Sequence, residues 1–180
     1  RHTMCIWLEE LTSRGKPKMA CGFAAADIFT GESALGEFHT DYRHQSTTFD
    51  ELERFVSTHN PVECIIIHNL SEDRVNDITQ YVGLNARKMH IVSFDNQWKA
   101  QAVGNCQKQT YQEGILAELY PGRDMDAFFE PFRQHLVATC AFCYLFDFLR
   151  TANKQLTKEL KEPRTVTNED RLVTANHSLV

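Results

Sequence analysis

Apolar and polar positions alternate over the first forty residues in a way that predicts three antiparallel strands. Thr3 to Leu11 is rich in β-branched, aromatic and cysteine residues, and a polar loop containing Gly and Pro follows it. Two further apolar runs, Met19 to Thr30 and Ser33 to His39, are joined by a short Thr-Gly-Glu turn. We therefore expect a meander of three neighbouring strands.

Helices and strands alternate in the middle of the chain. Glu51 stands three residues after Thr48 in the spacing of a capping box, Ser71 has the chemistry of an N-cap, and Gly83 that of a helix end. An apolar run with three consecutive isoleucines precedes Ser71, as expected of a strand buried on both faces. The predicted elements are a helix from 47 or 48 to 59, a strand over 62–68, a helix over 71–83 and a strand over 88–94. The fold class is therefore α/β, a mixed sheet flanked by helices.

The second half of the chain is predicted to be helical. One helical pattern runs from Gln97 to Tyr120 and a longer one from about Met125 to Asn153. From Leu136 to Leu149 the apolar residues lie almost all round, so this helix needs cover on two sides, from the domain's own tail or from a neighbouring domain. The candidate interdomain residues on it are Leu136, Cys140, Cys143 and Phe146.

Length and composition favour one domain within a larger protein. The 180 residues carry a formal charge of −5 and no Lys/Arg tract, so any DNA contact is expected to be indirect. We assign residues 1–155 to the domain and 156–180 to a charged linker with the start of the next segment. The chain opens on Arg1 and stops in an apolar stretch, as a piece of something larger would.

The cysteines and the apolar runs indicate an intracellular protein. Six cysteines mostly sit inside apolar segments, and no signal peptide precedes them, which favours free thiols in a reducing compartment. The longest apolar stretch, Leu136 to Phe146, is about half the ~20 residues that a membrane span requires. No membrane segment is expected.

Asp27 is the candidate for chemistry, with two incompatible interpretations. It can supply the first carboxylate of a two-metal nuclease, which needs several converging acids, or it can bond the backbone of the turn that it shares with Thr30 and Gly31. Cys140-x-x-Cys143 has the spacing of a metal or redox pair, but it lies on an apolar helix without a second pair and is interpreted as core.

Four blocks in order resemble the connector domain of the MutS mismatch-repair proteins. They are the strand ending Ala-Ala-Asp27-Ile-Phe-Thr-Gly-Glu, the stretch Asn60-Pro-Val-Glu-Cys-Ile-Ile after a helix, the helix from Ala138 to Arg150, and Leu172-Val-Thr-Ala-Asn176. Together they extend over nearly the whole chain. The first loop is basic and longer than in the family pattern, and Thr110 to Pro131 has no matching block.

The resemblance implies an RNase H-like fold that is not an enzyme and that passes conformational signals between mismatch-binding, lever and ATPase domains. Gln107, Lys108 and Gln109 lie where some family members dock MutL, which makes a MutL-like protein the expected partner beside the other domains of the parent. The parent is expected to be a homodimer that uses ATP and Mg. The resemblance implies that the family's Phe-x-Glu mismatch reader belongs to the mismatch-binding domain and not to this one, and the sequence has no Walker A loop, so no cofactor is expected in it.

Two alternatives remain open from the residues. One is a divergent RNase H-like metal-dependent nuclease that uses Asp27. The other is an unrelated α/β ligand-binding module, which predicts a large apolar pocket with a few polar groups.

Overall fold

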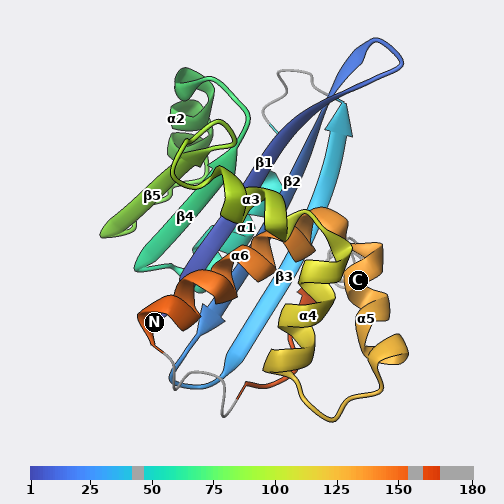
Figure 1. Cartoon of the computed structure of the whole chain (residues 1–180). Helices are drawn as coiled ribbons and strands as arrows, with labels where there is room; N and C mark the ends of the chain where they lie inside the picture. Colours follow the sequence, from blue (N-terminus) through green and yellow to red (C-terminus); the bar gives the residue numbers. More distant parts are fainter. Residues whose placement is uncertain (42–46, 154–159, 167–180) are drawn as a thin grey trace, which may run out of the picture.

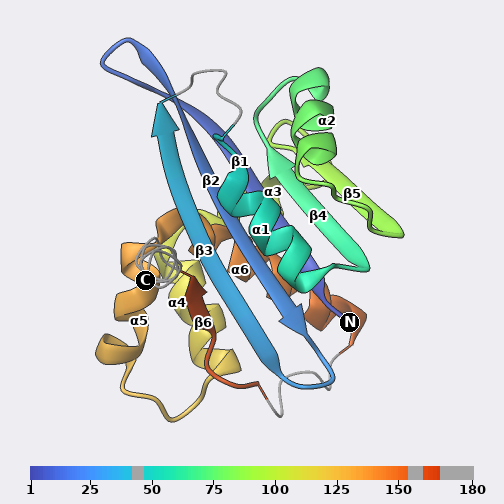
Figure 2. The same ribbon diagram turned by 180° about the vertical axis from the view of Figure 1, so that it is seen from behind.

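The computed structural model describes residues 1–41, 47–153 and 160–166. Its strands form one mixed sheet with the order β5-β4-β1-β2-β3-β6, in which β1 to β5 are labelled in Figure 1 and β6 in Figure 2. The strand bounds are β1 (Thr3–Ser13), β2 (Lys16–Asp27), β3 (Glu32–Asp41), β4 (Glu63–His68), β5 (Lys88–Ser93) and β6 (Arg164–Val166).

The predicted meander and the helix-linked strands are confirmed. β1, β2 and β3 are antiparallel neighbours, and β4 lies parallel to both β1 and β5. The loop between β1 and β2 shrinks to a two-residue turn, Arg14 and Gly15, with φ of 54° and 76°. Two positive φ angles in succession match the right-handed twist of a tight hairpin.

Helices cover both faces of the sheet. α1 (Asp50–His59) and α2 (Glu72–Tyr81) lie on the face seen in Figure 2, whereas α3 (Ala100–Cys106), α4 (Gln109–Leu119), α5 (Met125–Gln134) and α6 (Leu136–Ala152) lie on the other. Alternate residues of β1 enter the two cores, Met4 and Ile6 toward α1 and α2, Cys5 and Trp7 toward α6. Because the sheet is buried on both faces, apolar residues follow one another along its strands, and the alternation of apolar and polar residues is lost there.

Predicted helix ends are met at α2 but shifted at α1. Ser71 Oγ accepts a hydrogen bond from the backbone N of Arg74 at 3.3 Å. At the other end Gly83 has a φ of 68°, and the backbone N of Leu84 donates to Thr79 O at 3.1 Å, which closes a Schellman motif. α1 begins at Asp50 with Phe49 as its N-cap, one residue beyond Thr48, the later of the two expected caps.

The single helix expected over Gln97 to Tyr120 is wrong. It is two helices, because the backbone of Lys108 is extended (φ −94°, ψ 127°) between α3 and α4. The buried side chain of Gln112 donates from Nε2 to Cys106 O at 2.7 Å, so it satisfies a carbonyl that the end of α3 leaves without a helical partner.

The single helix expected over Met125 to Asn153 is also wrong. His135 (φ −131°, ψ 69°) separates α5 from α6, and Pro131 lies in the last turn of α5. The start of α6 is fixed by β3: Glu37 Oε1 accepts from the backbone N of Val137 at 3.0 Å and of Ala138 at 3.1 Å. The carboxylate thus acts as an N-cap supplied from the sheet.

A glycine in β2 lets α6 approach this closely. A Cβ on Gly22 would lie 2.4 Å from both the backbone C and O of Val137. Gly22 is also the cross-strand neighbour of Glu37. The first turn of α6 therefore rests directly on the backbone of the central strands.

The tail expected to be a linker contains a strand. Arg164–Val166 forms β6, which runs parallel to β3 and pairs with Ala34, Leu35 and Gly36. The predicted domain boundary at 155 and the apolar residues 173–180 lie outside the described residues. In the described part of the chain no helix is long and apolar enough to cross a membrane.

Candidate interdomain and docking surfaces

The carboxylate of Asp27 faces the turn that follows β2. Its Oδ1 accepts from the backbone N of Phe29 at 2.9 Å and of Thr30 at 3.4 Å, and Gly31 closes the turn with a φ of 76°. Although partial burial opposes it, the backbone hydrogen bonds from Phe29 and Thr30 hold the pKa of Asp27 below its ordinary value. This arrangement orders the hairpin between β2 and β3.

The other candidate acids are distributed over separate elements. Glu63 in β4 pairs with His90 Nε2 at 2.8 Å, and Asp147 in α6 pairs with Arg150 Nη2 at 2.7 Å. Asp73 lies in the first turn of α2. Among residues 1–41, 47–153 and 160–166, no three or more His, Cys, Asp or Glu side chains are grouped so that they could hold a metal ion. The nuclease alternative thus lacks a ligand set within these ranges.

The six thiols are free and mostly buried. Cys143 belongs to the core beneath α6, whereas Cys140 is only partly covered. Burial raises the pKa of the Cys140 thiol to about 12 and that of Cys143 well above its ordinary value. Thiols of this kind are weak nucleophiles, as expected of packing residues.

The predicted interdomain helix α6 is covered mainly by its own domain. It contacts β1, β2 and β3 on one side and α3, α4 and α5 on the other, and Leu160 of the tail packs against the same core. Neither a neighbouring domain nor a longer part of the tail is needed to cover it. Phe146 and Cys143 are fully buried, whereas Leu136 is 62% exposed. Among the four predicted positions, the start of the helix is the accessible one.

Gln107, Lys108 and Gln109 are brought together at the junction of α3 and α4. All three are exposed, and Gln109 Nε2 donates to Glu113 Oε1 at 3.0 Å. The structure therefore presents them on a surface corner, a placement that the expected continuous helix would not have given.

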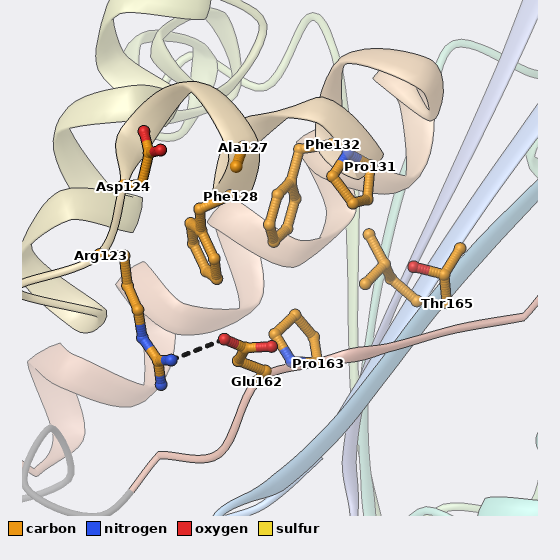
Figure 3. A pocket seen from close by; sticks show the side chains of 10 residues that line it. Arg123, Asp124, Ala127, Phe128, Pro131, Phe132, Glu162, Pro163 and Thr165 are labelled. Atoms are coloured by element: carbon orange, nitrogen blue, oxygen red, sulfur yellow. Dashed lines mark ion pairs between the residues drawn. The ribbon is translucent and has the colours of Figure 1, made fainter.

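A hollow of about 360 Å³ lies between α5 and the segment that leads into β6 (Figure 3). Phe128 and Phe132 line it from α5, and Pro163 and Thr165 from the opposite side. Its volume is at the low end for a small-molecule site. Arg123 Nη1 and Glu162 Oε1 form an ion pair at 2.7 Å beside it.

The sequence pattern did not predict an exposed apolar patch at the edge of the sheet, on β5 and at the residue before β4. Met89 and Ile91 are 37% and 49% exposed and point to the same face, and Val62 is 42% exposed. β4 is the one strand that pairs with β5 in the described sheet. The short apolar run of β5 signalled a strand, but nothing in its pattern distinguished an edge from a central position.

A comparison with protein-family models matches residues 4–163 to MutS domain II. The chain belongs to the MutS domain II family. The match extends from β1 to the segment before β6, so it includes both cores of this connector domain. The six-stranded sheet with its meander is accordingly the RNase H-like fold of the MutS connector, and an unrelated ligand-binding module is excluded.

The connector is also similar to a mimiviral protein. It is 28% identical over 120 residues to a putative DNA mismatch repair protein, a mutS homolog of Acanthamoeba polyphaga mimivirus. The aligned region is 62% of this chain and 11% of that relative. The chain therefore spans a small fraction of the length of a protein that it resembles.

Proposed function

We propose that this connector couples the mismatch-binding part of a MutS-like parent protein to its lever and ATPase parts. One observation carries this proposal: residues 160–166, the last described segment and here called the exit segment, are bonded to several elements at once. The backbone N of Lys161 donates to Gly31 O at 3.0 Å, and Tyr120 Oη donates to Lys161 O at 3.1 Å. β6 then continues the sheet beside β3.

A displacement of this exit segment would reach both layers of the domain. Gly31 belongs to the hairpin ordered by Asp27, and Tyr120 follows α4 and is fully buried. Coupling requires that nucleotide or DNA favours one position of the segment over another, because a ligand shifts a population only through differential interaction. The bonds of Lys161 are the contacts on which such a difference would act.

The test is made in the full-length parent with the double variant Tyr120→Phe, Glu162→Ala. These changes remove the hydrogen bond to Lys161 and the ion pair with Arg123 without opening the core. We expect mismatch affinity without nucleotide and basal ATP turnover to stay within about twofold, while ATP-driven release from mismatched DNA slows at least fivefold, a change of about 1 kcal/mol in coupling. Unchanged release would contradict the proposal. Glu72→Ala, at an exposed position on α2, is the control.

A second function, docking of a MutL-like partner, is proposed for Gln107, Lys108 and Gln109. Their exposure at the corner between α3 and α4 supports it. Replacing all three by Ala is expected to weaken binding of the MutL-like protein at least tenfold in a calorimetric titration. Gln80→Ala, at an exposed glutamine on α2, serves as the control. If the triple alanine variant and Gln80→Ala bind the MutL-like protein with equal affinity, docking at this surface is contradicted.

The remaining features of the proposal concern the parent. ATP and Mg would be bound outside this chain, the parent would be a homodimer, and contact of the connector with DNA would be indirect. The six free cysteines favour an intracellular, reducing compartment. The nuclease alternative that uses Asp27 is tested by incubating the chain with Mn²⁺ and DNA: cleavage that is lost in Asp27→Asn would support it.

A further inference from the structure

A second hollow, of about 390 Å³, lies beside the exit segment on the face of the sheet that α1 covers. His2 lines it just before β1, His59 at the end of α1, and Arg164 at the start of β6. The rings of His2 and His59 meet edge to face with centroids 5.0 Å apart. Besides Lys161, three side chains that can carry positive charge therefore gather here from three separate parts of the chain.

The carboxylates at this hollow already have cations of their own. Glu32 Oε1 lies 3.7 Å from Lys161 Nζ, and Glu162 is paired with Arg123. No ion pair of Arg164 occurs within residues 1–41, 47–153 and 160–166. Both acids therefore have a cation within ion-pair distance, which leaves the guanidinium of Arg164 as a permanent positive charge at the hollow, and protonation of His59 adds to it.

The geometry of His59 leaves one ring nitrogen for a ligand. Its Nδ1 lies 2.9 Å from Phe55 O, and because a carbonyl only accepts, Nδ1 carries the proton of the neutral ring. Nε2 becomes a donor once the ring is protonated. Burial lowers the pKa of His59, and the positive charges of His2 and Arg164 lower it further, against the hydrogen bond to Phe55. An anion between these groups would relieve that repulsion.

We propose that the hollow lined by His2, His59 and Arg164 binds a phosphate group and thereby fastens β6 to α1. Arginine offers a planar pair of donors to phosphate oxygens, and protonated imidazole adds charge-assisted donors. Since β6 has three residues and pairs with β3 alone in the described sheet, a ligand shared by Arg164 and His59 stabilises its docked position. This inference is independent of the coupling proposed above.

The experiment follows the histidine ring protons of the whole chain by NMR during pH titrations. Inorganic phosphate is compared with sodium chloride at equal ionic strength. In phosphate the pKa of His59 is expected to rise by about half a unit or more, with saturation below about 20 mM, since a nearby anion favours the protonated ring. An equal response to chloride, or a shift that does not saturate, overturns the proposal.

Variants separate the site from general screening. Arg164→Gln is expected to abolish the saturable shift of His59, whereas Arg87→Gln, at an exposed arginine before β5, leaves it intact. The shift surviving in Arg164→Gln would overturn the assignment. His2→Gln provides a second variant, in which half-saturation moves to at least threefold higher phosphate; unchanged half-saturation removes His2 from the site.

Two further ligands identify the source of the phosphate. Thymidine 5′-monophosphate presents a terminal phosphate, and a short unphosphorylated oligonucleotide presents only backbone diesters. Saturable shifts with the monophosphate alone assign the site to terminal phosphates, and shifts with both assign it to phosphates in general, including those of nucleic acid. Failure of both, together with failure of inorganic phosphate, refutes the site.

Discussion

Replacing Glu37 by Ala tests whether the sheet positions α6. The side chain of Glu37 is 9% exposed, and its Oε1 accepts hydrogen bonds from the backbone N of Val137 and Ala138. Loss of an N-cap costs about 0.5–2 kcal/mol, and a hydrogen bond to a charged group contributes about 1.5–3 kcal/mol. Because two amides lose one shared carboxylate, we expect the free energy of unfolding to fall by about 2–4 kcal/mol.

The assay is urea denaturation followed by circular dichroism. With a urea dependence of about 2 kcal/mol/M for a chain of this size, the midpoint should fall by about 1–2 M. Glu37→Gln keeps an oxygen acceptor but loses the charge, so its loss should be about half as large. Glu32→Ala, at an exposed position on the same strand, is the control, with a change within about 0.5 kcal/mol.

A Glu37→Ala variant as stable as the control would refute this reasoning. It would mean that the amides at the start of α6 are equally well satisfied by water or by a shifted helix. If Glu37→Ala lowers the urea midpoint and Glu37→Gln leaves it unchanged, the oxygen acceptor at position 37 stabilises the domain and the negative charge does not.

Three further predictions rest on single contacts. Gly22→Ala should lower the free energy of unfolding by about 3 kcal/mol or more, since the new Cβ meets backbone atoms of Val137, whereas Gly104→Ala, with open space around its Cβ, should raise it by about 0.5–1 kcal/mol, both measured by urea denaturation. Because the folded-state pKa of Asp27 lies below its unfolded value, its contribution is present above about pH 4 and lost as the pH falls through the folded value; Asp27→Asn should therefore be less stable than the parent chain at pH 7, with a difference that shrinks as the pH falls below about 4, and a constant difference would contradict this. At pH 8 a thiol reagent should modify Cys140 first and slowly and should reach all six thiols only in denaturant; rapid modification of Cys143 in the native chain would contradict the burial of this side chain.

The sheet could be predicted from the sequence because its signals are local. Alternation, an apolar run and two turns define β1 to β5, and the order of these elements already implies a mixed sheet. The chemistry of Ser71 and Gly83 is also local, since each acts within a few residues of its own position. Three of the four blocks of the resemblance fall in this well-predicted part and in α6, and the fourth, Leu172 to Asn176, lies outside the described residues.

The helix breaks could not be predicted because distant partners determine them. The break at His135 depends on Glu37 and Gly22, roughly a hundred positions earlier in the chain. The break at Lys108 leaves Gln107 and Gln109 on a corner, so the candidate docking surface itself depends on a feature without a local signal. β6 is a strand because the edge of β3 offers partners, and three polar-flanked residues carry no pattern of their own.

The dependence of α6 on Glu37 and Gly22 has a consequence for synthesis on the ribosome. The face of the sheet that carries Cys5 and Trp7 is completed by α6, whose last residue is Ala152. A nascent chain that ends before α6 therefore leaves this apolar face without the helix that rests on it, and such faces bind chaperones and aggregate. Truncations that stop before Leu136 are expected to need chaperone protection, because α6, the last helix in the described part of the chain, is the one at the centre of the domain.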